Sequence, residues 1–193
     1  MRCYIFNVYL VIMIKWYAIG LLLLSVLTSC VNRRFYQQAD YPFYSKAPAH
    51  GMGSLPRSDG VYMLQAEAGV DKGAAENRLY KFYDGGQVNM ILGIDHAAHP
   101  DSIISRFNNE ALRRRTLFQG YYRVQGKQLV IQQVNTARRQ FTYDYFFVEK
   151  DCLIHVSSGI EGRGRFRESP FASNFRAVYS FLPLRSSFTK PIW

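Results

Sequence analysis

Cysteine is scarce in this sequence: three residues, at positions 3, 30 and 152, are spread over 193. Two of them lie within the first thirty residues, so Cys152 has no partner in the rest of the chain. We therefore exclude a disulfide framework. Because Cys152 begins the apolar stretch Cys152-Leu153-Ile154, we interpret it as a small buried hydrophobic residue rather than as a nucleophile.

The sequence also lacks the short motifs of several enzyme classes. It contains no phosphate-binding loop, no dinucleotide fingerprint and no Gly-x-Ser-x-Gly between a strand and a helix. Ser157-Ser158-Gly159 follows a predicted strand without the required flanking glycine, and His155 in that strand is expected to be a surface or core residue. We therefore expect no enzyme, and a hydrolase is the less favoured alternative.

The first thirty residues differ in kind from the rest. Lys15 precedes an apolar run over residues 16–27, and the run ends in Leu27-Thr28-Ser29-Cys30. This order of a charged region, an apolar core and small residues is typical of a signal peptide. The closing tetrapeptide resembles the lipobox of bacterial lipoproteins. That resemblance implies cleavage of residues 1–29 and attachment of lipid, such as palmitate, to Cys30.

An uncleaved membrane-spanning helix is the alternative, because residues 3–14 are apolar as well. Lys15 would then lie near the middle of the bilayer, at a cost of roughly 2.5 to 3.5 kcal/mol. If translation starts at Met13, Lys15 becomes part of a short charged region and the apolar core has ordinary signal-peptide length. We favour the signal peptide, with Met13 as the preferred start.

Acidic residues are few: 14 stand against 24 lysines and arginines, which gives a formal net charge of +10. In a cytosolic protein this excess would indicate nucleic acid, but an exported chain meets anionic lipids and acidic glycans instead. Solvation of the protein surface is the simpler interpretation of the basic excess. We expect a membrane partner through the lipid and no nucleic acid. Val31 follows Cys30, so the aspartate that signals inner-membrane retention in enteric bacteria is missing. This favours the outer membrane of the cell envelope.

Residues 30–58 are predicted to form the lipidated cysteine and a flexible tether. They contain three prolines, polar spacers and no sustained periodicity. Five aromatic residues are unusual for a linker, and we expect them to pack on the following domain. They are Phe35, Tyr36, Tyr41, Phe43 and Tyr44.

Residues 59–193 are predicted to form a single all-β domain, because short runs rich in Val, Ile, Tyr and Phe alternate with turn residues. The runs are 60–66, 77–83, 87–94, 117–124, 128–134, 140–149, 152–157 and 176–182. Gly85, Gly86 and Gly126 supply the backbone freedom that tight hairpins require. Within residues 95–115, apolar spacing predicts one short helix from near Ser102.

Eight runs with short antiparallel turns favour an up-and-down eight-stranded barrel over an open sandwich, because closure leaves no exposed sheet edge. Over residues 59–184 the chain resembles lipocalin-like domains of bacterial lipoproteins. Gly60-Val61-Tyr62 is similar to the family's Gly-x-Trp opening, with Tyr in place of Trp, and Thr142-Tyr143-Asp144-Tyr145 to its Thr-Asp-Tyr segment. The resemblance implies that Arg176 takes the place of the family's late-strand arginine. The resemblance implies a fold more than an activity.

The candidate ligand-binding residues are tyrosines, which a small barrel uses either as core filling or as the amphipathic lining of a cavity. They are Tyr62, Tyr80, Tyr121, Tyr143 and Tyr145. Arg163, Arg165 and Arg167 alternate with Gly or Phe, so an extended backbone would align three guanidinium groups for anion binding. A solvated loop is the simpler interpretation of these arginines.

His96 and His99, with Asp95 and Asp101, are residue types that bind transition metals, but no third histidine is near and Pro100 disfavours a shared face. We therefore predict no metal and no cofactor, and a metalloenzyme remains a minor alternative. The leading hypothesis is a membrane-anchored envelope lipoprotein, a non-catalytic binding module for an apolar or amphipathic small molecule. The alternative is a structural or assembly lipoprotein that binds another envelope protein or an anionic glycolipid.

Overall fold

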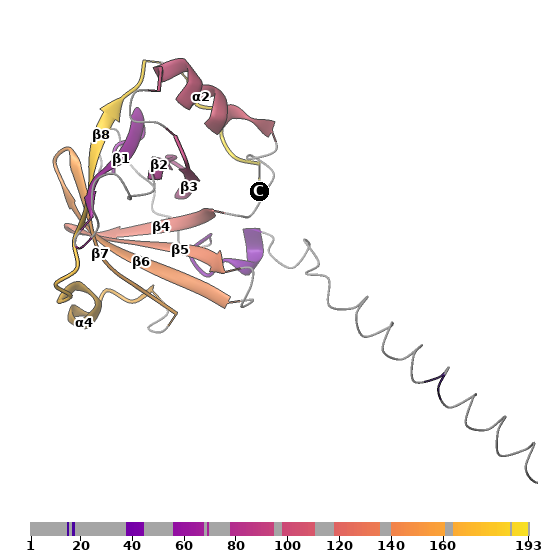
Figure 1. The fold of residues 1–193 in the computed structure, drawn as a ribbon. Helices are drawn as coiled ribbons and strands as arrows, with labels where there is room; N and C mark the ends of the chain where they lie inside the picture. The colour runs from indigo at the N-terminus through magenta and orange to yellow at the C-terminus, as the bar shows by residue number, and fades with distance from the viewer. Residues whose placement is uncertain are drawn as a thin grey trace, which may run out of the picture. The chain divides into compact units, whose positions relative to one another are not determined.

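All eight predicted runs form strands in the computed structural model, with ends that differ from the predicted ones by no more than two residues. Each strand pairs antiparallel with the next, and β8 pairs with β1, so the sheet closes into an up-and-down barrel (Figure 1). The strands are β1 (Gly60–Glu67), β2 (Arg78–Phe82), β3 (Gln87–Leu92), β4 (Gln119–Gln125), β5 (Gln128–Asn135), β6 (Gln140–Glu149), β7 (Cys152–Gly159) and β8 (Ala177–Pro183).

The chain divides into two compact units, Met1–Phe35 and Tyr36–Trp193, and the barrel belongs to the second. The predicted lipidation site, Cys30, lies outside the described residues, as does the predicted signal peptide apart from Lys15 and Tyr17. Within the described part of the chain, no helix is long and apolar enough to cross a membrane. The structure describes residues 15, 17, 38–44, 56–67, 69, 78–94, 98–110, 118–135, 140–160, 164–185 and 187–192.

The two ends of the barrel differ in the length of their connections. The β2–β3, β4–β5 and β6–β7 connections are tight hairpins, and Gly86 and Gly126 adopt the positive φ predicted for the first two of them. We call this end the hairpin end. The longer β1–β2, β3–β4 and β7–β8 connections lie at the opposite end together with the β5–β6 connection, because successive turns of an up-and-down barrel alternate between its ends. We call that end the loop end.

Strand β6 shows why both faces of the wall are apolar. Its aromatic side chains Tyr143 and Tyr145 belong to a cluster on the outside of the barrel, whereas Phe146 and Val148 belong to the cluster inside it. A strand that is buried on both faces has no solvent-facing side on which polar residues would be favoured. The fold therefore consists of a filled interior and two layers that cover opposite parts of the outer wall.

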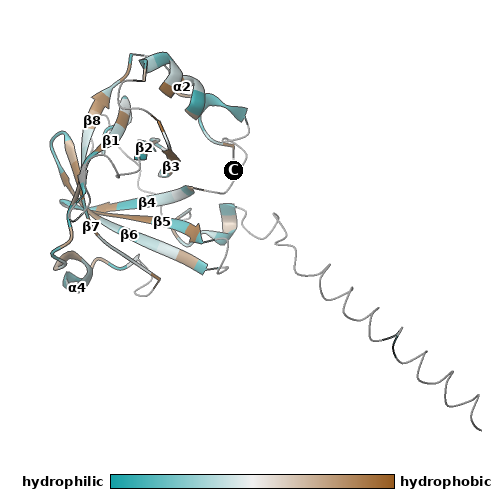
Figure 2. Cartoon of the chain, in the orientation of Figure 1, coloured by the Kyte–Doolittle hydropathy of each residue, from teal (hydrophilic) through white to brown (hydrophobic). Residues whose placement is uncertain are grey.

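Helix α2 (Pro100–Asn108) forms one of the covering layers. Its buried residues Ile103 and Phe107 pack on the outer wall beside Val61 and Leu79, and the rest of the helix is largely hydrophilic (Figure 2). The helix starts two residues earlier than predicted, since proline is well tolerated at the first helical position, where no backbone N–H is required. A second helical turn, α4 (Glu168–Phe171), covers the wall near β6 and β7.

Residues 38–44, which we call the strap, form the other covering layer together with α4. The strap contains the short 3-10 helix η2 (Gln38–Asp40) and buries Tyr41 and Phe43 on the outer wall. The Tyr41 ring meets the Tyr121 ring edge-on, with centroids 5.1 Å apart. The predicted packing of Tyr41 and Phe43 on the domain is confirmed, and this part of the predicted tether belongs to the compact unit that contains the barrel.

Candidate functional site at the loop end of the barrel interior

The interior of the barrel is packed with aromatic side chains toward the hairpin end. Phe82 makes edge-on contacts with Tyr62 and with Tyr122, at centroid distances of 5.6 and 5.0 Å. Each of these three side chains is almost fully buried. Such tightly packed interiors leave few voids, so this part of the barrel acts as a core.

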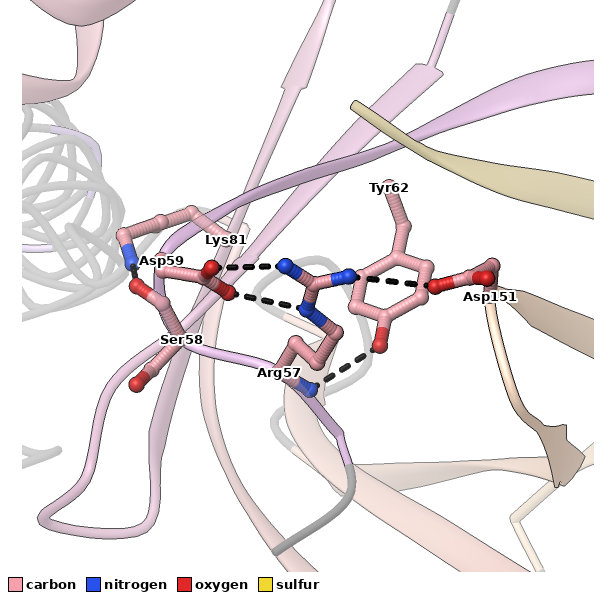
Figure 3. Close-up of polar contacts among 6 residues, drawn as sticks. All are labelled: Arg57, Ser58, Asp59, Tyr62, Lys81 and Asp151. Atoms are coloured by element: carbon pink, nitrogen blue, oxygen red, sulfur yellow. Dashed lines mark hydrogen bonds and ion pairs between the residues drawn. The ribbon is translucent and has the colours of Figure 1, made fainter. Parts of the chain in front are cut away.

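A network around Arg57 covers the hairpin end (Figure 3). The Arg57 guanidinium donates two hydrogen bonds to Asp59, at 2.7 and 3.0 Å, and one of 3.1 Å to Asp151 in the β6–β7 turn. It also lies over the Phe181 ring, 4.0 Å from the centroid. The Arg57 backbone N–H donates to the Tyr62 hydroxyl at 2.9 Å, which joins the network to the aromatic core. This end of the barrel is therefore tied together by ionic and aromatic contacts.

The opposite end of the interior carries polar side chains. The Ser158 hydroxyl donates to Asp144 Oδ1 at 2.6 Å, and the Gln133 amide donates to Asp144 Oδ2 at 3.1 Å. His155 Nε2 lies 3.1 Å from the Ser158 oxygen and 3.9 Å from Asp144. These four residues come from β5, β6 and β7, at inward positions next to the apolar core. We call them, with Arg78 and Glu67, the loop-end cluster.

The tautomer of His155 follows from its contacts. Nε2 lies 3.0 Å from the backbone carbonyl oxygen of Ser157, and because a carbonyl only accepts, Nε2 carries the proton. Nδ1 is then the unprotonated nitrogen, and it is buried without a hydrogen-bond partner in the described part of the chain. Burial is the main cause of a lowered pKa for His155, which the nearby Asp144 carboxylate opposes. The imidazole is therefore held neutral.

Arg78 and Glu67 complete the cluster from β2 and β1. Arg78 donates to Glu67 at 3.2 Å, and the guanidinium also lies close to the Tyr179 hydroxyl. Burial raises the pKa of Tyr179 to about 12 and that of Tyr80 well above its usual range, so both hydroxyls keep their protons. The cluster thus offers neutral hydroxyl and amide groups as well as an ion pair.

The cluster has an excess of negative charge and partial access to solvent. Among the described residues it contains two carboxylates, Glu67 and Asp144, against the single guanidinium of Arg78, while His155 is neutral. The Asp144 side chain is 16% exposed and that of His155 is 12% exposed. A carboxylate at the edge of a packed apolar interior favours a ligand end that donates hydrogen bonds or carries positive charge.

The structure separates the five tyrosines that the sequence proposed as ligand residues. Tyr62 and Tyr80 point into the barrel, whereas Tyr121, Tyr143 and Tyr145 lie on the outside of the wall under the strap and α4. Tyr80 is the member next to the loop-end cluster, because its hydroxyl interacts with Gln133. The five side chains therefore do not line one cavity.

The other predicted site residues lie apart from the cluster. Arg165 and Arg167 are exposed on the outside, and Arg165 lines a hollow there, while Arg163 is outside the described residues. His99 caps the start of α2, where its Nδ1 accepts a 3.4 Å hydrogen bond from the Asp101 backbone N–H, and His96 also falls outside the described residues. In the part of the chain that is described, no group of three or more metal-ligating side chains occurs.

Sequence reasoning missed most of the loop-end cluster. Asp144 stands between Tyr143 and Tyr145 in an aromatic strand, and Gln133 lies two residues after the apolar run over residues 129–131. Polar residues at inward positions of otherwise apolar strands were the available signal. The signal became usable only with the register, which places Asp144 opposite Ser158 on β7 and Gln133 beside it on β5.

Comparisons with known proteins yielded no match to a protein-family model, to a curated protein or to a solved structure. The architecture itself defines the class: an antiparallel, up-and-down, eight-stranded closed barrel, which is consistent with a lipocalin-like fold. Buried aromatic clusters inside and outside the wall are compatible with a binding module of this class.

Proposed function

We propose that this chain is a lipid-anchored envelope protein whose barrel binds an amphipathic small molecule at the loop end. The observation that carries the proposal is the loop-end cluster, in which Asp144, His155 and Ser158 form a partly accessible polar site against a packed aromatic interior. A polar ligand end would contact these groups, and its apolar part would lie against the adjoining aromatic side chains.

The charge of the cluster narrows the ligand class. Asp144 and Glu67 carry two negative charges against the one positive charge of Arg78. A ligand whose polar end is an amine or a neutral group rich in donors is therefore favoured over one that ends in a carboxylate. A ligand donor would share the Asp144 carboxylate with Ser158 and Gln133. The unprotonated Nδ1 of His155 is a further acceptor in the cluster, although this atom is buried in the free protein.

The module is proposed to be non-catalytic, although serine, histidine and aspartate lie together. In a serine hydrolase the histidine accepts the serine proton and is oriented by the aspartate through its other nitrogen. Here Ser158 donates directly to Asp144, and His155 Nε2 carries a proton directed at the Ser157 carbonyl. The base nitrogen is therefore not directed at the serine hydroxyl.

The anchor is supported by the sequence pattern around Cys30 alone. The proposed location is the outer membrane, with the lipid on Cys30 as the link to it and the barrel facing the periplasm or the exterior. Further along the chain, the strap is held on the outer wall of the barrel through the buried side chains of Tyr41 and Phe43.

Native mass spectrometry of the full protein after gentle purification tests the binding function. The wild type is expected to retain a co-purified molecule of constant mass, and Asp144→Asn is expected to lose most of it. Glu149→Gln is the matched control, because it removes an exposed carboxylate from the hairpin end of the same strand. A wild type that carries no bound molecule and takes up neither decylamine nor decanol would refute the proposal.

A further inference from the structure

We infer that the outer wall of the barrel carries a second binding site, for a single-chain anionic amphipath with a phosphate or carboxylate head. The site lies between the strap and the segment 164–166, over β4 and β6. It is separate from the loop-end cluster, because the strap packs on the outside of the wall and the cluster lies inside it. The inference is therefore independent of the proposed function.

A cavity of about 720 Å³ marks the site. Small-molecule sites commonly occupy roughly 300 to 1,000 Å³ and combine apolar walls with a few convergent polar groups. Both features are present here. The lining residues are Pro42, Phe43, Arg123, Gln125, Phe141, Tyr143, Gly164, Arg165 and Phe166.

Two guanidinium groups supply the head-group contacts. Arg123 lies 5.4 Å from the Phe43 ring centroid and 6.0 Å from that of Phe166, so aromatic rings flank its charge. Arg165 lies on the same cavity, from the neighbouring segment. Within the described part of the chain, no carboxylate forms an ion pair with either arginine. An anionic head group would pair with both of them.

The walls of the cavity are held in place by buried contacts. Gln132, which is 0% exposed, accepts a 3.1 Å hydrogen bond from the Phe43 backbone N–H and donates one of 3.0 Å to the Tyr143 hydroxyl. Gly164, with φ of +63°, packs so tightly that an added β-carbon would lie 2.7 Å from the Tyr143 ring and closer still to Phe43. The cavity is therefore built before a ligand arrives, which limits the entropic cost of binding.

The chemistry of the site separates it from the barrel interior. Its charged residues are positive and most of its apolar lining residues are aromatic, so it would take an anionic head and an alkyl chain together. The loop-end cluster has the opposite charge excess and would take a donor or a cation. Decyl phosphate and decanoate are therefore probes for the outer site, and decylamine is a probe for the inner one.

Isothermal titration of the full protein with decyl phosphate tests the inference, with Arg123→Gln and Arg165→Gln as variants. Each variant is expected to weaken binding by about tenfold, because each removes a charged hydrogen-bond donor. Arg167→Gln is the matched control: it removes an exposed arginine two residues from Arg165 that does not line the cavity, and binding is expected to be unchanged. Arg165 is itself exposed, so its substitution leaves the fold intact.

Three results would overturn the inference. Equal losses in Arg165→Gln and Arg167→Gln with no loss in Arg123→Gln would assign binding to the basic loop and not to the cavity. If inorganic phosphate bound as tightly as decyl phosphate, the alkyl chain and the aromatic walls of the cavity would contribute nothing to binding. A loss of decyl phosphate binding in Asp144→Asn would place the ligand inside the barrel. Decanoate binding that follows the same pattern as decyl phosphate supports the carboxylate form of the proposed ligand.

Discussion

The Ser158 hydroxyl donates a 2.6 Å hydrogen bond to Asp144 inside the barrel, across the β6–β7 pair. Gln133 is the only other described residue that donates a hydrogen bond to this carboxylate. The two hydrogen bonds stabilise the charged Asp144 carboxylate, which is largely buried at the end of the apolar interior. The carboxylate in turn makes the proposed ligand site negatively charged.

Ser158→Ala is expected to lower the free energy of unfolding by about 1 kcal/mol, because Asp144 loses one of its donors at a partly solvent-accessible position. Urea denaturation followed by circular dichroism measures this quantity. Ser105→Ala, at an exposed position of α2, serves as the control and is expected to change stability by less than about 0.5 kcal/mol. Equal effects of the two substitutions would show that the Ser158 hydroxyl is not structurally important.

The lowered pKa of His155 predicts a specific pH dependence. The unfolded chain binds a proton near pH 6.5, whereas the folded state binds it only at lower pH. The wild type should therefore lose stability relative to His155→Gln as the pH falls below about 6.5, and the difference should be constant above it. Denaturant unfolding of both proteins between pH 5 and 8 measures the difference. A wild type that gains stability relative to His155→Gln toward pH 5 would show that folding raises the pKa of His155, contrary to the prediction.

Lys81 provides a second titration, on the outside of the wall. Its side chain is 1% exposed, donates to the Phe82 carbonyl at 2.9 Å and to the Ser58 carbonyl, and lies 4.3 Å from the Phe188 ring centroid. Figure 3 shows the contact with Ser58. Burial lowers the pKa of Lys81 to about 8, and no described carboxylate pairs directly with it.

Between pH 8 and pH 10 the unfolded chain keeps the Lys81 proton that the folded state releases. The unfolding free energy of the wild type should therefore rise relative to Lys81→Met, by about 2 kcal/mol over this range. Above pH 10 tyrosine titration lowers the stability of both proteins alike, since burial raises the pKa of Tyr62 to about 12, and this contribution cancels from their difference. A flat difference between the two proteins from pH 8 to 10 would show that Lys81 has the same pKa in the folded and the unfolded chain, and would contradict the lowered pKa.

The proposed lipid anchor is tested by metabolic labelling with radioactive palmitate. The wild type and Cys152→Ala should both incorporate the label, because Cys152 is a free, half-buried residue of β7. Cys30→Ala should lose the label and should leave the membrane fraction. Equal incorporation by the wild type and Cys30→Ala would refute acylation at this position.

The strands could be predicted from the sequence because alternation and glycine turns are local signals. Even β6, which is apolar on both faces, was delimited at Gln140 and Glu149 by the polar residues at its ends. The sequence showed that both faces of β6 are apolar, but it did not show what covers the outer face. Covering the outer wall requires the strap and α4, which lie far from β6 in sequence and reach it only in the folded chain.

The candidate site could be predicted far less well. Tyrosines on predicted strands were selected without knowing which face of the wall each occupies, and Tyr143 and Tyr80 fall on opposite faces. Asp144 and His155 meet because β6 and β7 pair with a bulge after Tyr145. A bulge changes which residues face inward, and it cannot be read from alternation alone.

The His155 side chain reports most directly on the proposed ligand site. The chain has four histidines, so the imidazole carbon signal of His155 can be assigned in the NMR spectrum of the full protein by comparison with His155→Gln. Titration with decylamine is expected to shift this signal to saturation in the wild type and in Glu149→Gln, and to leave it unchanged in Asp144→Asn. Decylamine binding that leaves the His155 signal unmoved in the wild type would contradict the assignment of the loop-end cluster as the binding site.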